Sequence, residues 1–149
     1  FHAGDAYNVI PQSAELAGTV RTLQKEMRAF AEIRMKEVAA GIALAYGAEI
    51  AVDYEQNYPV TVNHAQETDF AVSVASAQAG GANVNSQTPP VMGGEDFSYM
   101  LEARPGAFIF IGNGDTAHLH HPEYDFNDEV IPHGVSYWVN LAETALAAR

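Results

Sequence analysis

The sequence has no cysteine. The chain therefore forms no disulfide and offers no thiolate, so any metal ligand must be a nitrogen or oxygen atom. Basic side chains are also scarce: seven Lys and Arg stand against nineteen Asp and Glu, for a formal net charge of −12. This balance argues against a nucleic-acid partner, because phosphates are bound by basic surfaces. No apolar run approaches the roughly 20 residues of a membrane span, so we expect a cytoplasmic protein without a membrane partner.

The length and the distribution of charge favour two small domains. The 149 residues are 48% hydrophobic, which is typical of a packed globular chain. Residues 63–149 carry eleven of the nineteen acidic side chains but only two of the seven basic ones. Such asymmetry often marks a domain boundary or a site that attracts cations. With a Tyr58-Pro59 break nearby, we expect domains at 1–62 and 63–149.

The first of these parts has the pattern of an α+β unit. Short β-rich runs at Tyr7–Ile10 and Leu16–Leu23 predict a hairpin, and apolar residues at helical spacing predict a helix over 24–46 that ends at Gly47. Apolar and polar residues alternate over 49–55, which predicts a third strand. This order is an incomplete split βαβ sandwich. Because half of the sandwich is missing and the chain begins at Phe1 without methionine, we expect a fragment. Charged side chains off the helical stripe are interpreted as a solvated face: Lys25, Arg28, Glu32, Arg34, Lys36 and Glu37.

The second part alternates helical patterns with one apolar run. Helices are expected over 63–79, 97–102 and 133–148, the last with Trp138 on its apolar stripe. Residues 107–111 predict a strand buried on both faces. Gly93 and Gly94 precede Glu95 and Asp96, whose charges favour the start of a helix. Asn127 or Asp128 can cap the turn before the last helix.

The run from His118 to Glu129 concentrates the metal-competent side chains of the chain. Three of the six histidines lie in it, at 118, 120 and 121. In an extended segment His118 and His120 would point to the same side, and Pro122 would favour an extended His121. An imidazole held in one orientation suits a metal ligand or a general acid. The same residues are also compatible with an acidic surface loop.

Four segments together resemble one protein family. They are N-V-I-P at 8–11, G-T-V-R at 18–21, G-G-E-D-F at 93–97, and L-H-H-P-E-Y-D-F-N-D-E at 119–129. In this order and spacing they are similar to the metal-dependent aminoacylases and amidohydrolases that include hippurate hydrolases and plant auxin-conjugate hydrolases. The resemblance covers essentially the whole chain.

The resemblance implies a zinc-peptidase-like hydrolase with an α/β catalytic domain and an inserted ferredoxin-like lid that commonly forms a homodimer. Residues 1–62 would be the latter part of the lid and 63–149 the C-terminal part of the catalytic domain. By similarity, His120 matches a metal ligand, and Asn8 and Arg21 match lid residues that bind the substrate. Gly93 and Gly94 match a glycine turn beside the substrate.

The resemblance also implies a mechanism. Two divalent ions, of zinc, manganese, cobalt or nickel, would activate a water that attacks the amide of an N-acyl amino acid. Arg21 would bind the substrate carboxylate, and Asn8 would donate to the developing oxyanion. The remaining ligands and the glutamate general base would lie upstream of Phe1, so no catalytic residue is assigned here. Because one imidazole cannot hold a catalytic metal, we expect the isolated piece to be inactive.

Two other classes of protein stay open. A cupin-like enzyme with a single metal would use His118 and His120 as paired ligands, but it needs many short strands. Alternatively, residues 1–62 would act as a ligand-binding or dimerisation module without catalysis.

Overall fold

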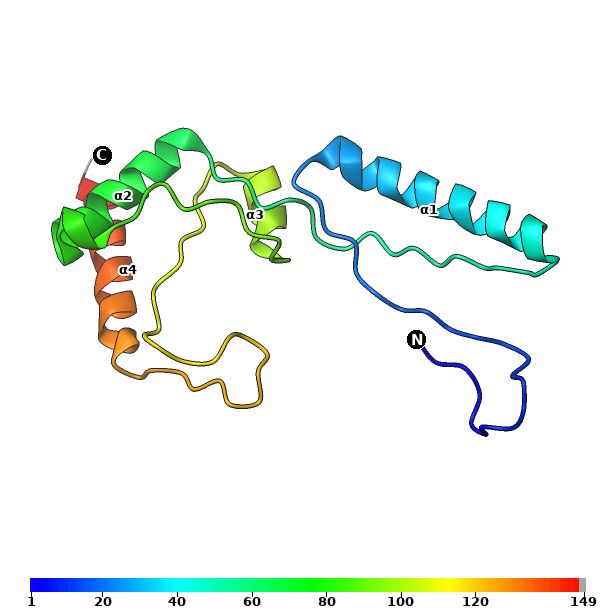
Figure 1. Cartoon of the computed structure of the whole chain (residues 1–149). Helices are drawn as coiled ribbons and strands as arrows, with labels where there is room; N and C mark the ends of the chain where they lie inside the picture. Colours follow the sequence, from blue (N-terminus) through cyan, green and yellow to red (C-terminus); the bar gives the residue numbers. More distant parts are fainter. Residues whose placement is uncertain (148–149) are drawn as a thin grey trace. The chain divides into compact units, whose positions relative to one another are not determined.

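The computed structural model describes residues 1–147, and in this part of the chain the regular structure is helical (Figure 1). The described residues contain no extended strand. The helices are α1 (Lys25–Tyr46), α2 (Ala65–Ala79), the short 3₁₀ helix η1 (Gly81–Asn83), α3 (Phe97–Ala103) and α4 (Val130–Ala147).

All four predicted α-helices are confirmed, within a few residues at their ends. Helix α1 ends where expected, because Gly47 has a left-handed φ of 64° and its N–H binds the carbonyl of Ala43. Helix α4 begins earlier than predicted, at Val130, whose N–H binds the carbonyl oxygen of Asn127 at 3.0 Å. Pro132 lies in the first turn, where a missing N–H costs no helical hydrogen bond. The predicted end of this helix, residue 148, lies outside the described residues.

The predicted strands are wrong for the described residues. Tyr7–Ile10, Leu16–Leu23, 49–55 and 107–111 are all irregular. The only β-pairing within residues 1–147 is one isolated antiparallel bridge between His2 and Glu15. An alternating pattern selects a strand's faces, but a strand forms only when a neighbour accepts and donates its backbone hydrogen bonds. The ferredoxin-like arrangement predicted for residues 1–62 is therefore not seen.

The chain divides into two compact units. The first holds Phe1–Val60 together with Met92–Gly94, and the second holds Thr61–Val91 and the stretch from Glu95 onward.

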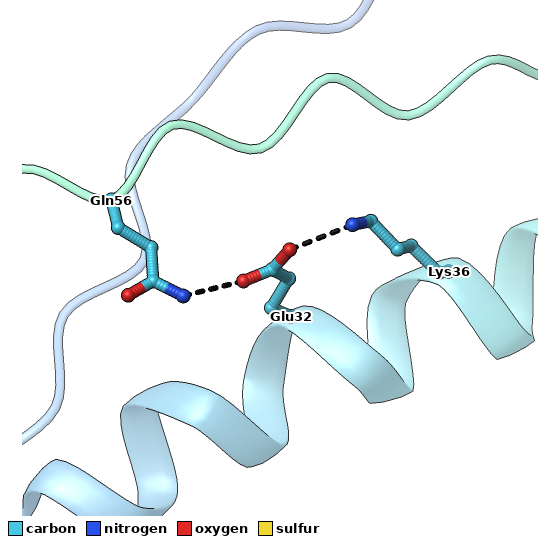
Figure 2. Close-up of polar contacts among 3 residues, drawn as sticks. All are labelled: Glu32, Lys36 and Gln56. Carbon is cyan, nitrogen blue, oxygen red and sulfur yellow. Dashed lines mark hydrogen bonds and ion pairs between the residues drawn. The ribbon is translucent and has the colours of Figure 1, made fainter.

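Polar contacts fasten α1 to the chain that follows it in the first unit. The carboxylate of Glu32 accepts from Lys36 Nζ at 2.7 Å and from Gln56 Nε2 at 2.6 Å (Figure 2). Arg28 Nη2 donates to the carbonyl oxygen of Asn57. The hydrogen bonds from Lys36 and then Gln56 hold the pKa of Glu32 below its ordinary value of 4.5. The expected solvated face of α1 therefore also makes exposed contacts to residues 56 and 57.

The apolar stripe of α1 has the predicted spacing, but it does not form a core. No residue of this helix is buried. Phe30 and Ile33 are 54% and 58% exposed, and Met27 and Val38 are also exposed. The stripe lacks the sheet against which the sequence pattern would have packed it.

The second unit has a small core where α2 packs on α4, and one apolar residue of α3 is also buried. Ala71, Val74, Leu101 and Tyr137 are buried. Burial raises the pKa of the Tyr137 phenol. The expected inward residue, Trp138, is 60% exposed instead. Apolar residues occur on all sides of α4. The sequence pattern therefore did not distinguish whether Tyr137 or Trp138 would be buried.

The start of α2 is attached to the segment that follows α3. The Asn63 side chain donates to the carbonyl oxygen of Phe108 and accepts from its N–H, both at 2.8 Å. The His64 N–H binds the carbonyl oxygen of Gly106 at 3.0 Å, and His64 Nδ1 accepts from the Gly106 N–H at 3.2 Å. These bonds attach residues 106–108 to the start of α2 without forming a strand. Phe110 is 68% exposed, so the expected burial of 107–111 on both faces is wrong.

None of the helices in the described part of the chain is both long enough and apolar enough to cross a membrane.

Candidate functional site

The histidine run lies in the long connection between α3 and α4 and is folded into tight turns (Figure 1). The N–H of His121 binds the carbonyl oxygen of His118 at 3.0 Å, which closes a turn over 118–121. The N–H of Glu123 binds His121 Nδ1 at 3.1 Å. The extended conformation predicted for this run is therefore wrong. Pro122 restricts only the residue directly before it, so the two residues further back were free to turn.

His120 occupies the strained position of this turn. It has a φ of 67° and is the one non-glycine residue with positive φ among those described. This conformation costs roughly 1–2 kcal/mol for an L-residue, and residues held in it concentrate at functional sites. The His120 side chain is exposed. The predicted metal ligand is thus presented to solvent on a strained backbone.

The described residues offer a metal only part of a coordination shell. No group of three or more His, Asp or Glu in residues 1–147 is placed to hold an ion. His120 fits a single nitrogen ligand by its donor chemistry and exposure. The pair His118 and His120 has no third ligand among these residues, and the strands of a cupin are not found there. The structure therefore gives no support to the cupin-like alternative.

Arg21 and the glycine pair come together in the first unit. Arg21 Nη1 donates to the carbonyl oxygen of Met92 at 2.8 Å. A Cβ added at Gly94 would lie 3.5 Å from Arg21 Nη1 and 3.4 Å from Tyr58 Cδ2, whereas one added at Gly93 would meet nothing within 4 Å. Neither glycine has a positive φ. An added Cβ at Gly94 would thus be in ordinary contact with Arg21 and Tyr58, and no left-handed turn requires glycine there.

The structure does not join Asn8 to this group. Asn8 is exposed in a turn that is closed by a 3.4 Å hydrogen bond from the Val9 N–H to the carbonyl oxygen of Ala6. Within the described part of the chain, no hydrogen bond connects Asn8 with Arg21.

Glu95 makes hydrogen bonds that stabilise the start of α3. Its carbonyl oxygen accepts from the Ser98 N–H at 3.2 Å and from Ser98 Oγ at 2.5 Å. Its carboxylate lies 3.5 Å from the Phe97 N–H, in the position that compensates the positive end of a helix. Ser98 is fully buried. Asp96, next to it, makes no side-chain cap hydrogen bond.

Two polar residues of the histidine-bearing connection were missed by the sequence reasoning. Asn113 and Thr116 both bind the backbone of Asp125 from the other arm of the connection. The available signal was an asparagine between two glycines, Gly112 and Gly114, the second with a φ of 87°. That signal predicts a turn but not a contact twelve residues away.

Comparison with known proteins shows which family the sequence resembles. The model of peptidase family M20/M25/M40 matches residues 4–144. A hippurate hydrolase of Campylobacter jejuni is 35% identical over 142 residues, which cover 95% of this chain and 37% of that protein. An N-acetylcysteine deacetylase of Bacillus subtilis is 38% identical over 144 residues, 97% of this chain and 37% of the relative.

A third relative has a different named activity. A thermostable carboxypeptidase 2 of Saccharolobus solfataricus is 37% identical over 112 residues, 74% of this chain and 28% of that protein. No solved structure gives a significant match. The chain spans little more than a third of the length of the first two relatives. Since the family model matches nearly all of the sequence, the chain belongs to peptidase family M20/M25/M40.

Proposed function

We propose that the chain is part of a metal-dependent amidohydrolase that cleaves the amide bond of N-acyl amino acids. The observation that carries this proposal is identity of 35% and 38%, over almost the whole chain, to a hippurate hydrolase and an N-acetylcysteine deacetylase. Both names describe an acyl group on an amino acid. Their substrates share an amide next to a carbon that bears a carboxylate.

The substrate carboxylate is assigned to Arg21. Its guanidinium presents five N–H donors in a planar fork, of which one binds the Met92 carbonyl oxygen. A planar fork matches the two oxygens of a carboxylate better than a lysine ammonium does. The small space at Gly94 lies beside this guanidinium. Asn8 is proposed to donate to the carbonyl oxygen of the scissile amide.

The metal is assigned in part to His120. The complete protein would hold two divalent ions, of zinc, manganese, cobalt or nickel, and His120 would supply one imidazole nitrogen. Such a metal, when bound, lowers the pKa of a coordinated water and polarises the amide carbonyl. The other ligands and the general base would come from outside residues 1–147.

We further propose the domain division expected from the sequence. Residues 1–62 would belong to a lid that forms a homodimer, and residues 63–149 to the catalytic domain of an α/β protein. The exposed apolar stripe of α1 is compatible with packing against further protein in the lid. The cytoplasmic location stays a prediction.

Peptides are a second candidate class of substrate, and the same experiment tests them. The similarity to a protein named as a carboxypeptidase supports a second hypothesis, in which the last peptide bond of a peptide is hydrolysed. That bond is also an amide beside a terminal carboxylate, so the proposed role of Arg21 would be the same. The two classes differ in the group on the acyl side.

The experiment uses the full-length protein, stripped of metal and reloaded with each candidate ion. Hydrolysis of N-benzoylglycine and of N-acetyl amino acids is measured beside that of dipeptides with a free amino group. We expect metal-dependent cleavage of the N-acyl amino acids. Cleavage of dipeptides alone would favour the carboxypeptidase. A reloaded enzyme that hydrolyses none of these compounds would contradict both assignments.

A further inference from the structure

The connection between α3 and α4 is closed at its base by one carboxamide. Asn113 Nδ2 donates to the carbonyl oxygen of Asp125 at 2.8 Å. Asn113 Oδ1 accepts from the N–H of Asn127 at 2.8 Å. The carboxamide therefore satisfies a backbone acceptor and a backbone donor at once, which fixes the orientation of its oxygen and nitrogen.

Thr116 makes a second closure just inside the first. Its Oγ1 accepts from the N–H of Asp125 at 3.2 Å and lies 3.3 Å from the carbonyl oxygen of the same residue, to which it donates. Among the described residues, no backbone-to-backbone hydrogen bond joins the arms 113–117 and 123–127. The hydrogen bonds of Asn113 and Thr116 therefore join the two arms through side chains.

The closed base is attached to the start of α4. Asn127 Oδ1 accepts from the N–H of Glu129 at 3.0 Å, and the Asn127 carbonyl oxygen accepts from the N–H of Val130 at 3.0 Å. Because Asn113 binds the N–H of the same residue, the base of the connection is tied to a helix that packs on α2. A helix is a more rigid support for a site than a loop is.

The tip of the connection carries the strained histidine. His120 has its positive φ inside the turn of residues 118–121. A strained backbone of this kind persists only when the surrounding structure holds it in place. The turn is one part of that support, and the two closures at the base are the other.

We propose that Asn113 is a positioning residue, assisted by Thr116, that holds the tip of this connection so that the imidazole of His120 stays where the metal requires it. This inference rests on the proposed function, in which His120 is a metal ligand. Groups that orient a ligand contribute to metal affinity without touching the metal. Asn113 and Thr116 act in this way through the backbone of residues 125–127.

The test measures metal affinity in the full-length enzyme by competition with a chelator. Asn113→Leu removes both hydrogen bonds at nearly constant size, and Thr116→Val does the same for the threonine. We expect Asn113→Leu to weaken metal binding by about 10- to 100-fold, and Thr116→Val to weaken it less. Asn85→Leu is the matched control, because the side chain of Asn85 makes a local bond to the Gln87 N–H. This control should leave the affinity unchanged.

Hydrogen exchange and a double variant separate positioning from general stability. In Asn113→Leu, amide hydrogens of residues 113–127 should exchange faster while those of α2 do not. In a His120→Ala background, Asn113→Leu should weaken metal binding no further, because its effect passes through the missing imidazole. Additive losses would overturn the proposal.

The two possible failures are distinguishable. If His120→Ala leaves metal affinity unchanged, the assignment of the ligand is wrong and the positioning role falls with it. If His120→Ala weakens binding while Asn113→Leu and Thr116→Val do not, only the positioning role is overturned. Should Asn113→Leu fail to fold, Thr116→Val carries the same test.

Discussion

Arg21 donates from Nη1 to the carbonyl oxygen of Met92 at 2.8 Å, although the two residues are 71 positions apart in the sequence. This bond brings the arginine beside the Met92–Gly94 stretch, which follows a long irregular segment. The G-T-V-R motif thereby meets the two glycines of the G-G-E-D-F motif within the first unit, while Glu95 and the residues after it belong to the second. The proposed carboxylate site depends on this meeting.

Replacing Arg21 with Lys tests the carboxylate role. Lysine keeps the charge but loses the planar fork, so the KM for N-acyl amino acids in the full-length enzyme should rise by about tenfold or more, with a smaller change in kcat. The same assay on an N-acyl amine without a carboxylate is the control, and there the variant should match the wild type. An unchanged KM for carboxylate-bearing substrates would remove Arg21 from the site.

Gly94 and Gly93 should respond differently to the same substitution. At Gly94 the first added carbon meets Tyr58 and Arg21 at ordinary contact distance, so the methyl groups of valine have to displace one of them. Gly94→Val should therefore raise KM in parallel with Arg21→Lys, because displacing the guanidinium disturbs the same proposed carboxylate site. Gly93→Val, with open space around it, is the matched control. Equal effects at both positions would argue against the packing account.

Glu32 should make stability depend on pH in the acid range. Hydrogen bonds from Lys36 and Gln56 depress the pKa of its carboxyl in the folded chain. A depressed pKa gives a stabilising contribution that is present above pH 4.5 and is lost as the pH falls through the folded-state value. Glu32→Gln should accordingly lower Tm at pH 7, and the difference from the wild type should vanish in acid.

Glu37→Gln is the control for this effect. It removes another 2.7 Å ion pair, with Arg34, that lies wholly within α1 and makes no contact with Gln56. The Tm difference at pH 7 should be smaller than for Glu32→Gln. A Glu32→Gln difference that persists unchanged at low pH would show that the carboxylate charge is not its source.

Asn63 should stabilise the second unit through its two bonds to Phe108. Each net hydrogen bond contributes about 0.5–1.5 kcal/mol, so Asn63→Ala should lower the free energy of unfolding by about 1–3 kcal/mol. Urea unfolding measures this loss. Asn85→Ala, which removes one local bond at an exposed site, should have less effect. Equal losses for the two variants would contradict the proposed attachment.

Local sequence patterns predicted the helices but not the strands. The helical period and the glycine after Tyr46 predicted α1 because a helix satisfies its hydrogen bonds within its own segment. The alternation over 49–55 did not suffice, because a strand requires a partner that local pattern does not specify. Family membership was predicted from four separate motifs, which do not depend on secondary structure.

The candidate site was predicted in part. The sequence motifs selected Arg21 and His120 as site residues, and the structure adds the Arg21 bond to Met92 and the positive φ of His120. The closures made by Asn113 and Thr116 were not predicted, because they join positions nine to twelve residues apart across a loop. Sequence spacing gives no register for side-chain bonds between the arms of a loop.

The metal content of the full-length protein tests the central claim most directly. Wild type and His120→Ala are purified under the same conditions, checked for equal folding, and measured by elemental analysis. The proposed function predicts two equivalents of divalent metal in the wild type and loss of at least one in the variant, together with loss of N-acyl amino acid hydrolysis. A variant that keeps both its metal and its activity would contradict the account.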